Sequence, residues 1–356
     1  MSRVSGLSKQ TVSTVIADLE SLHLVEAVGV TEGGIGRRAL TYRLSPKAGY
    51  SVGIDLGGTN FRAGVVDFSG EVLSELTLVT PHASVDELLE IMVSAIDQLT
   101  LKHGMPKSQL SQIVIGIPGA VNPITGVISS APNVAYLNGL NLGRLISKKL
   151  KVSVLIENDV NIAALGELEQ STSNDFGFLA IGTGVGMGLI LDGELRRGFS
   201  GGAGEVGYLP LGHKALEPSV EGHFEKMVGG FAGEIKYHEL SGSKVSLEEI
   251  FDLSNHGDQI AKKIIEDLAI YIALGIKTVC SILDLEEIVL GGGIGSRPDL
   301  EKQILCNLQR LMPTPPKVRI SNLGSRAGLI GAMSCALSEM RSRVLVHGSL
   351  KGNSDV

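Results

Sequence analysis

The sequence contains no tryptophan, only 4% aromatic residues, and three cysteines that form no CxxC pair. Such sparse cysteines give no basis for a disulfide framework or a thiolate zinc site. No apolar run approaches the roughly 20 residues that a membrane-spanning helix needs, and the start lacks a signal-peptide pattern. We therefore expect a soluble, cytoplasmic protein with no membrane partner.

Excess charge of one sign is also scarce: 19% of the residues are charged and the formal net charge is -7. This balance excludes a general binder of polyanions, so any DNA contact must be local. Glycine and apolar residues are abundant instead, with 46 glycines and 43% hydrophobic residues. The composition favours aliphatic cores with many tight turns, and the length indicates roughly two or three domains.

The stretch SGLSKQTVSTVIADLE, residues 5–20, has the pattern of a one-faced helix. Its apolar residues recur at helical spacing: Val12, Val15, Ile16 and Leu19. Ser8 precedes them as the expected N-cap. Residues at its start are of the kinds that contact phosphates and base edges in a recognition helix: Ser8, Lys9, Gln10, Thr11 and Thr14. Taken alone, the helix is equally compatible with one that only packs against the rest of the protein.

Downstream, GGIGRRALTYRLS predicts two short strands that flank Arg37 and Arg38. A hairpin with two arginines after a polar-faced helix favours a winged helix-turn-helix that binds operator DNA. This DNA-binding region is expected over residues 1–46, and SPKAGY (45–50) reads as a linker.

A repeated pattern follows the linker. VGIDLGGTNFRAGVVDFSGE (52–71) and FLAIGTGVGMGLILDGE (178–194) both read as apolar strand, glycine loop, apolar strand and acidic turn. Two such copies predict two similar α/β lobes, one over 50–170 together with a last helix over 326–340, and one over 171–325.

Three glycine loops, each after an apolar strand, predict nucleotide binding. Their candidate phosphate- and nucleotide-binding residues are Gly57, Gly58, Thr59, Gly182, Thr183, Gly184, Gly186, Gly291, Gly292 and Gly293. Asp55 lies at a strand end beside the first loop, where a carboxylate can hold Mg²⁺ through water.

Asp159 in ENDVN lies where a strand passes into a helix. One interpretation is an N-cap, although Asn158 is also available for that role. The other is a general base, placed between two phosphate loops, that takes a proton from a substrate hydroxyl as its oxygen attacks the γ-phosphate.

An ordered set of motifs along the chain resembles that of the ROK family of repressors, open reading frames and kinases. The motifs are GRRAL, GIDLGGTN, IPGAVNP, PNV, ENDVN, GTGVGMG, GEVGY, LGGGI and GLIGA. The resemblance implies a two-lobed, actin-like ATPase (ribonuclease H-like) sugar kinase fold with an N-terminal, incomplete winged helix-turn-helix. It further implies ATP with Mg²⁺ in a kinase-active protein, Asp159 as the base, and a homodimer or higher homo-oligomer. The implied sugar-binding residues are Asn133, Asn158, Asp159, Glu205, Tyr208 and Glu225.

The chain departs from the family pattern at the zinc site. Tyr208 stands where the family usually has a zinc-binding histidine, and GHFE (222–225) aligns with the end of its cysteine motif. All the thiolates are missing, so we expect no metal. An alternative nitrogen/oxygen site of His213, Glu221 and His223 is disfavoured.

A second departure concerns the start of the chain. Only MSRVS precedes the GLS motif, whereas family repressors carry a full helix and part of a second there. We expect either a start further upstream or weakened DNA binding.

Two functions compete. A sugar-responsive transcriptional regulator is favoured by the attached helix and hairpin, and an ATP-dependent kinase for a hexose or amino sugar is favoured by the intact loops. A remnant that binds neither ligand is the third alternative.

Overall fold

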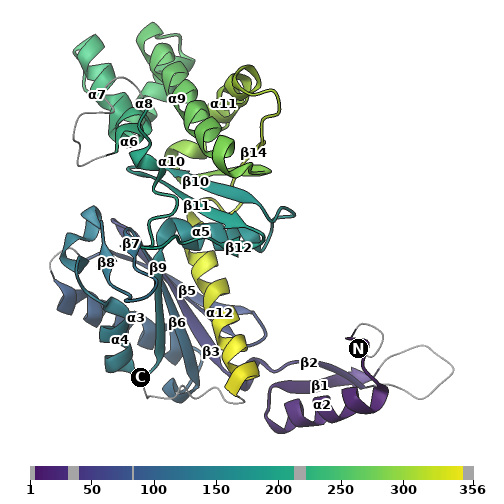
Figure 1. Ribbon diagram of the computed structural model, residues 1–356. Helices are drawn as coiled ribbons and strands as arrows, with labels where there is room; N and C mark the ends of the chain where they lie inside the picture. The colour runs from purple at the N-terminus through teal and green to yellow at the C-terminus, as the bar shows by residue number, and fades with distance from the viewer. Residues whose placement is uncertain (1–4, 31–39, 82–83, 212–221, 348–356) are drawn as a thin grey trace. The chain divides into compact units, whose positions relative to one another are not determined.

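The structure, a computed structural model, describes residues 5–30, 40–81, 84–211 and 222–347 (Figure 1). Its contacts divide the chain into two compact units. Unit 1 consists of Met1–Ile115, Asn141–Ile156 and Ala332–Val356, and unit 2 consists of Gly116–Leu140 and Glu157–Gly331. Residues 116–140 and 157–170, which we expected in the first lobe, therefore group with unit 2.

A helix and a hairpin begin the described part of unit 1. Helix α2 (Lys9–Ser21) starts after Ser8, whose side chain accepts a hydrogen bond of 3.1 Å from the Thr11 amide, so the predicted N-cap is confirmed. Strands β1 (Val25–Val30) and β2 (Leu40–Leu44) pair antiparallel. The expected arginines of the hairpin turn, Arg37 and Arg38, lie outside the described residues.

The sheet of unit 1 has five strands in the order β5-β4-β3-β6-β9. These strands are β3 (Tyr50–Leu56), β4 (Asn60–Asp67), β5 (Val72–Val79), β6 (Leu110–Ile117) and β9 (Ser153–Asn158). The first three form an antiparallel meander. Every residue of β3 is buried, which explains its nearly continuous apolar sequence.

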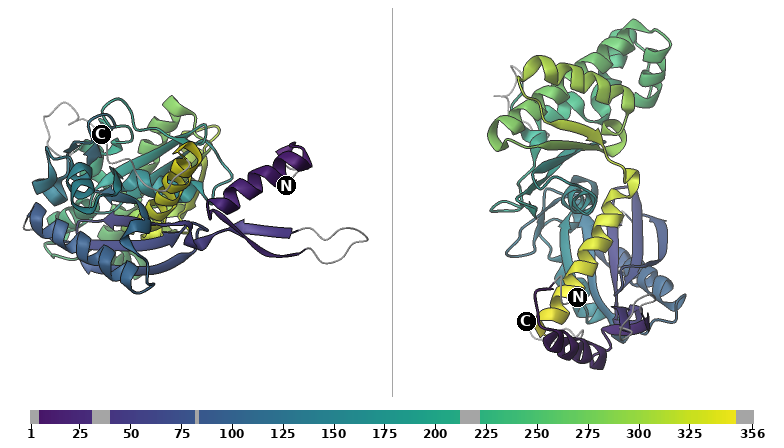
Figure 2. Two further views of the ribbon diagram at one scale, coloured as in Figure 1. Left: turned by 90° about the horizontal axis from the view of Figure 1, so that it is seen from below. Right: turned by 90° about the vertical axis from the view of Figure 1, so that its right-hand side faces the viewer.

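Helices cover the sheet of unit 1. They are α3 (Val85–Leu101), α4 (Leu142–Leu150) and the C-terminal α12 (Ala327–His347), with short turns η1 (Pro46–Ala48) and η2 (Lys107–Gln109). Helix α12 runs along the strands (Figure 2), and a Cβ added to Gly53 of β3 would lie 2.4 Å from the Met333 amide nitrogen. Glycine is therefore required there because helix and strand backbones approach closely.

Unit 2 repeats this strand arrangement in the order β12-β11-β10-β13-β14. Its strands are β10 (Phe176–Ile181), β11 (Val185–Leu191), β12 (Glu194–Leu195), β13 (Glu287–Gly291) and β14 (Lys317–Ile320). Strands β10, β11 and β12 pair antiparallel, while β13 runs parallel to both β10 and β14. The two strand–loop–strand copies expected from the sequence are thus antiparallel pairs at equivalent places in two sheets of one topology.

The remaining elements of unit 2 were only partly expected. Besides α5 (Asp159–Leu168) and α9 (Gln259–Leu283) they are β7 (Ala120–Val121), β8 (Ile128–Ser129), η3 (Pro132–Leu137), η4 (Val206–Tyr208), α6 (His223–Val228), α7 (Gly230–Ser241), α8 (Leu247–Asn255), α10 (Gly292–Gly295), α11 (Pro298–Leu311) and η5 (Gly324–Arg326). The third glycine loop is thus partly a short helix. No helix among the described residues is both long and apolar enough to span a membrane.

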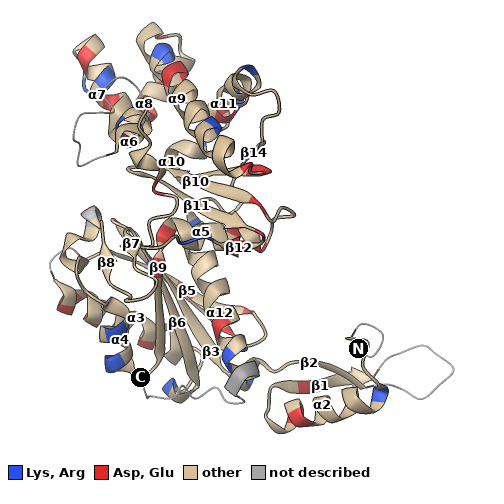
Figure 3. Ribbon diagram, in the orientation of Figure 1, with Lys and Arg blue, Asp and Glu red and all other residues tan. Residues whose placement is uncertain are grey.

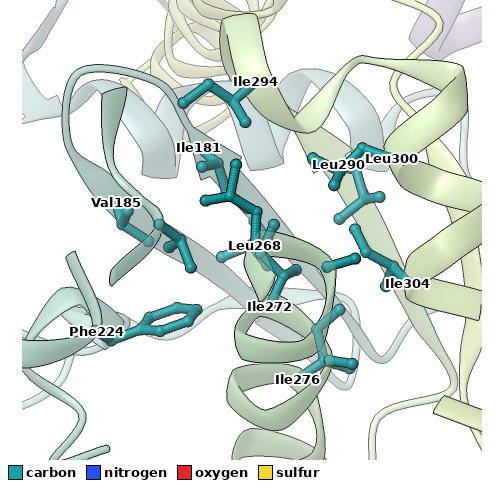
Figure 4. Packing of buried hydrophobic residues seen from close by; sticks show 14 of the residues in the cluster. Ile181, Val185, Phe224, Leu268, Ile272, Ile276, Leu290, Ile294, Leu300 and Ile304 are labelled. Carbon is teal, nitrogen blue, oxygen red and sulfur yellow. The ribbon is translucent and has the colours of Figure 1, made fainter. Parts of the chain in front are cut away.

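The core of unit 2 lies between its sheet and α9 and fixes the glycine loops (Figure 4). Ile181 and Val185 flank the second loop, and Ile294 ends the third; all are at most 7% exposed. Phe224, 1% exposed, sits over Gly275 of α9, where an added Cβ would lie 2.5 Å from its ring. Burial of these side chains holds the backbone next to the candidate site residues in place.

Candidate functional site

The first glycine turn joins β3 to β4 in unit 1. The Gly57 amide donates to the Asn60 carbonyl over 2.9 Å, and Thr80 anchors the turn by donating its hydroxyl to the Gly57 carbonyl over 2.7 Å. Gly58 is half-buried and Thr59 is exposed. Because the Gly57 amide already donates to Asn60, an anion bound at this turn would need hydrogen bonds from other groups of the turn.

Asp55 lies at the end of β3 with 8% of its surface exposed. Burial raises the pKa of its carboxyl group, and the nearby Arg62 guanidinium opposes that shift. Arg62 Nη1 lies 3.3 Å from Asp55 Oδ2. A single carboxylate suits Mg²⁺, which keeps several waters and needs few protein oxygens. Asp55 therefore fits the role of a magnesium ligand, in competition with Arg62.

The second glycine turn, Gly182–Gly184, joins β10 to β11 in unit 2. The Gly182 amide donates to the Gly184 carbonyl over 3.0 Å. Glu225 of α6 supports the turn, because its Oε2 accepts a hydrogen bond of 2.8 Å from the Val185 amide. The sequence motif did not show this bond, which joins residues forty positions apart.

Glycines on β11 allow α5 to pack closely. A Cβ on Gly186 would lie 3.2 Å from Val160, and one on Gly188 would lie 2.5 Å from the Cβ of Ala164. Close packing against α5 therefore accounts for a glycine at position 186, apart from the phosphate binding that we predicted for it.

The third glycine segment adjoins the second. An added Cβ on Gly182 would lie 3.9 Å from the Gly293 amide nitrogen. Gly292 has φ +78° and its Cβ position lies 2.3 Å from the Ile181 carbonyl, so only glycine fits. A cavity of about 280 Å³ opens beside it, lined by Leu247, Glu248, Phe251, Gly293, Ile294 and Arg297.

Arg297 forms one wall of this cavity. Its guanidinium lies 3.9 Å from the centre of the Phe251 ring, a cation–π contact. The cavity and two glycine segments of unit 2 are therefore neighbours.

Asn158 and Asp159 begin α5. Asn158 Oδ1 accepts from the amides of Val160 and Asn161 over 2.9 and 3.0 Å, which confirms it as the N-cap. Asp159 Oδ1 accepts from the Val160 amide over 2.8 Å and its side chain is half-buried. A carboxylate at a helix start is stabilised as an anion by the helix dipole.

The other candidate sugar ligands surround η4 and α6. Partial burial raises the pKa of the Glu205 carboxyl group, and the charge of Glu225 raises it further. The two carboxylates are thus close enough to repel each other. Tyr208 is 55% exposed at the end of η4. Asn133 lies in η3. The segment just before it packs against Gly119, because a Cβ added to Gly119 would lie 2.7 Å from the Cβ of Ala131.

One buried ion pair at this site escaped the sequence analysis. The Glu157 side chain, 6% exposed, accepts from Arg197 Nε over 2.5 Å. Glu157 belongs to the ENDVN motif and Arg197 to the segment after β12. No local sequence pattern links two charged residues so far apart, so the ion pair could not be predicted from the sequence.

Metal ligands are not clustered in the part of the chain that the structure describes, where no group of three or more His, Cys, Asp or Glu side chains can hold an ion. His223 is described, whereas His213 and Glu221 of the alternative site lie outside the described residues. The expectation of no zinc remains a prediction.

The candidate DNA-contacting residues of α2 lie on an exposed surface: Ser8, Lys9, Gln10, Thr11 and Thr14. Ser8 also holds Thr11 through a hydroxyl contact of 2.8 Å, and the Thr14 hydroxyl donates to the Gln10 carbonyl over 3.2 Å. Charges are few on this segment (Figure 3), and Arg43 is engaged by Glu26 at 2.5 Å. Among the residues that the structure describes, Lys9 is the basic one at the start of α2.

The model of the ROK family matches residues 51–339 of this chain. The chain belongs to the ROK family. Its α/β fold with mixed sheets is that of ROK kinases and regulators of known structure. The match begins after the helix and hairpin, so these N-terminal elements are additional to the ROK module.

ROK relatives of both functional kinds resemble the chain. A xylose repressor from Bacillus spizizenii is 26% identical over 349 residues, covering 95% of this chain and 90% of the repressor. The crystal structure of a ROK family glucokinase from Streptomyces griseus in complex with glucose and AMPPNP is 26% identical, with a TM-score of 0.67, and covers 82% of this chain and 100% of that one. A ROK family transcriptional regulator, a homolog of the E. coli MLC protein, has a TM-score of 0.78 at 19% identity and covers 99% of this chain and 93% of its own.

Unit 2 contains most of the candidate nucleotide- and sugar-binding residues. The second and third glycine segments, Glu205, Glu225 and the start of α5 are connected there by the contacts given above. Asp55 and the first glycine turn belong to unit 1.

Proposed function

We propose that this protein is a transcriptional regulator that responds to a sugar. Residues 1–46 form its DNA-binding region, with α2 as the recognition helix and the β1–β2 hairpin as the wing. The ROK module, residues 51–339, binds the sugar. Operator DNA and a sugar are the partners, and a homodimer matches the usual two-fold symmetry of operators.

The observation that carries this proposal is the extent of the two kinds of similarity. The alignment with the xylose repressor covers 95% of this chain. The match to the glucokinase structure covers all of the glucokinase but only 82% of this chain. The segment outside the ROK module has a capped helix with an exposed polar start and no buried residue. A kinase needs no such segment, while a regulator needs an exposed helix for the major groove.

The sugar site is proposed at Asn133, Asn158, Asp159, Glu205, Tyr208 and Glu225. Carboxylate and amide groups of this kind recognise hydroxyls by hydrogen bonds, and a site built to bond a hydroxyl discriminates strongly against a ligand that lacks it. Burial and the charge of Glu225 raise the pKa of Glu205, so its carboxyl group keeps its proton to a higher pH than an ordinary glutamate does.

Fluorescence anisotropy tests the DNA-binding half of the proposal. Labelled DNA from upstream of the protein's own gene should bind at least about tenfold more tightly than random DNA of equal length. Both affinities should fall steeply between two salt concentrations, because phosphate contacts release counterions. Equal affinity for both DNAs at both salt concentrations would contradict the proposed function as a transcriptional regulator.

An ATP-dependent sugar kinase is the second candidate, favoured by the cavity of about 280 Å³ beside the third glycine segment. Adenosine is proposed to bind there, with phosphates at the glycine turns. Asp159 is the proposed base for the attacking sugar hydroxyl. Mg²⁺ near Asp55 would neutralise phosphate charge when bound.

Release of ADP in the presence of Mg²⁺ and a panel of hexoses, amino sugars and N-acetylated sugars tests the kinase. Asp159→Ala should reduce sugar-dependent release by about 10²–10⁴-fold, the range for loss of a general base. Its affinity for a fluorescent ATP analogue should stay unchanged. Undiminished ADP release by the variant contradicts the role of Asp159, and no release by the wild type rules out the kinase for those sugars.

A further inference from the structure

We propose that Arg197 is a positioning residue of the candidate sugar site and acts through the buried carboxylate of Glu157. The inference rests on the proposed sugar site, and it adds a residue that neither touches the sugar nor belongs to the predicted ligand set. Its basis is a hydrogen-bond network within unit 2 that joins three segments carrying or adjoining those ligands.

Glu157 is the centre of this network. Its Oε2 binds Arg197 Nε at 2.5 Å. Its Oε1 accepts from the Asn158 amide at 2.9 Å and from Asn161 Nδ2 at 3.0 Å. Both oxygens of a carboxylate that is almost fully buried are therefore used, one for the arginine and one for the start of α5.

Asn158 extends the network to the segment before β7. Its Oδ1 caps α5, and its Nδ2 donates to the Gly119 carbonyl over 3.2 Å. A fixed Glu157 thus fixes the backbone at Asn158, and with it the direction in which the Asn158 and Asp159 side chains leave the helix start.

Arg197 extends the network to the segment that carries Glu205. Its carbonyl accepts from the Ala203 amide over 3.1 Å, which closes the intervening turn. Gly201 in that turn has φ +88° and its Cβ position lies 2.1 Å from the Val121 carbonyl, so the turn lies tightly against the end of β7. The arginine therefore sits between Glu157 and the turn leading to Glu205.

The charge explains why this position needs a cation. The Glu157 side chain is 6% exposed and the Arg197 side chain 39% exposed. Removal of one partner of a buried ion pair leaves an uncompensated charge, which is far more costly than removal of both. A neutral residue at 197 should hence displace Glu157 towards water and release Asn158 and Asn161.

Arg196 is a matched control. It precedes Arg197 directly, but its guanidinium pairs with Asp192 and Glu194, whose side chains are 86% and 75% exposed. Surface pairs of this kind contribute little. Arg196→Met therefore removes the same type of side chain without touching Glu157.

Amide hydrogen exchange on the full chain tests the positioning role without any sugar. Arg197→Met should speed exchange over residues 157–161 and 198–205 by about tenfold or more, since it breaks a buried pair. Arg196→Met should stay within about twofold of the wild type, as surface substitutions do. Arg197→Lys, which retains a cation, should lie between them. Equal exchange in Arg197→Met and Arg196→Met overturns the proposal.

A double-mutant cycle on sugar affinity, measured by calorimetry with a sugar that the wild type binds, separates positioning from direct contact. Arg197→Met should weaken binding by about tenfold or more. Addition of Glu157→Gln removes the stranded charge while its amide oxygen can still accept from Asn158, so the double variant should recover most of that loss. No recovery means that Arg197 contacts the sugar itself and overturns the proposal. If the wild type binds no sugar, the proposed sugar site fails, while the exchange result still decides the role of Arg197.

Discussion

Glu225 shows how one side chain can serve two predicted subsites. Its Oε2 accepts a hydrogen bond from the Val185 amide beside the second glycine turn, and its charge raises the pKa of Glu205. An added Cβ on Gly184 would lie 3.0 Å from the same oxygen. A sugar hydroxyl that donated to the same oxygen of Glu225 would therefore compete with the Val185 amide for it.

The carboxyl group of Glu205 gives a pH prediction. Because its pKa is raised in the folded protein, its contribution to stability is fully present below the ordinary value of 4.5 and is lost as pH rises through the raised value. Glu205→Gln should therefore raise the melting temperature at pH 7 more than at pH 4, measured by thermal unfolding.

Glu249 supplies a control of opposite sign, since hydrogen bonds from Ser246 lower its pKa. Its stabilising effect is present above the ordinary value of 4.5 and lost as pH falls through the lowered one. Glu249→Gln should lower the melting temperature at pH 7 more than at acid pH. The same pH trend for both variants would contradict the Glu205 assignment.

Asn158 tests the helix start. Asn158→Ala removes the acceptor of two amides and should lower the free energy of unfolding by about 1 kcal/mol. Asn158→Ser keeps a capping oxygen and should recover most of that loss. Urea unfolding of both variants measures the difference, and equal values would show that capping is not what Asn158 contributes.

At the scale of secondary structure, α5 carries the candidate base and is packed closely on two sides. Gly188 of β11 faces its Ala164, and a Cβ on Gly331 of α12 would lie 1.9 Å from the Ile162 carbonyl. Glycine is thus used in these elements to bring backbones together, whereas Gly293 has open space at its Cβ position.

Gly188→Ala should therefore lower the free energy of unfolding by about 1–3 kcal/mol, because an added methyl group overpacks the contact with α5. Gly293→Ala should leave stability nearly unchanged and serves as the control in urea unfolding. Similar losses in both variants would mean that the close packing of α5 is not what stabilises this region.

Helix α2 gives a prediction about DNA recognition. Lys9→Ala should weaken binding to all sequences alike and reduce the salt slope by about 1, as expected for a phosphate contact. Gln10→Ala should instead relax sequence preference at one position, at a cost of about 1–3 kcal/mol. Selection of bound sequences from a random pool, combined with salt titrations, distinguishes the two. An unchanged preference and affinity in both variants would remove α2 from the interface.

At the scale of the whole molecule, local patterns predicted the parts that depend on neighbours in sequence. The paired strands around the first two glycine turns, the Ser8 cap and the Asn158 cap follow from short motifs and are confirmed. The pair of Glu157 and Arg197 and the bond from Val185 to Glu225 were missed, because each joins residues forty positions apart. Periodicity and motif spacing carry no information about which distant side chains meet.

Coupling between sugar binding and DNA binding is measured by titrating DNA in the presence of each sugar of the panel. By linkage, a sugar that the ROK module senses must change the affinity for upstream DNA by the same factor by which DNA changes the affinity for the sugar. We expect one sugar to shift the Kd for upstream DNA by about 5–150-fold and to leave binding to random DNA unchanged. If the protein binds a sugar yet shows the same Kd for upstream DNA with and without it, the protein is not a sugar-responsive regulator.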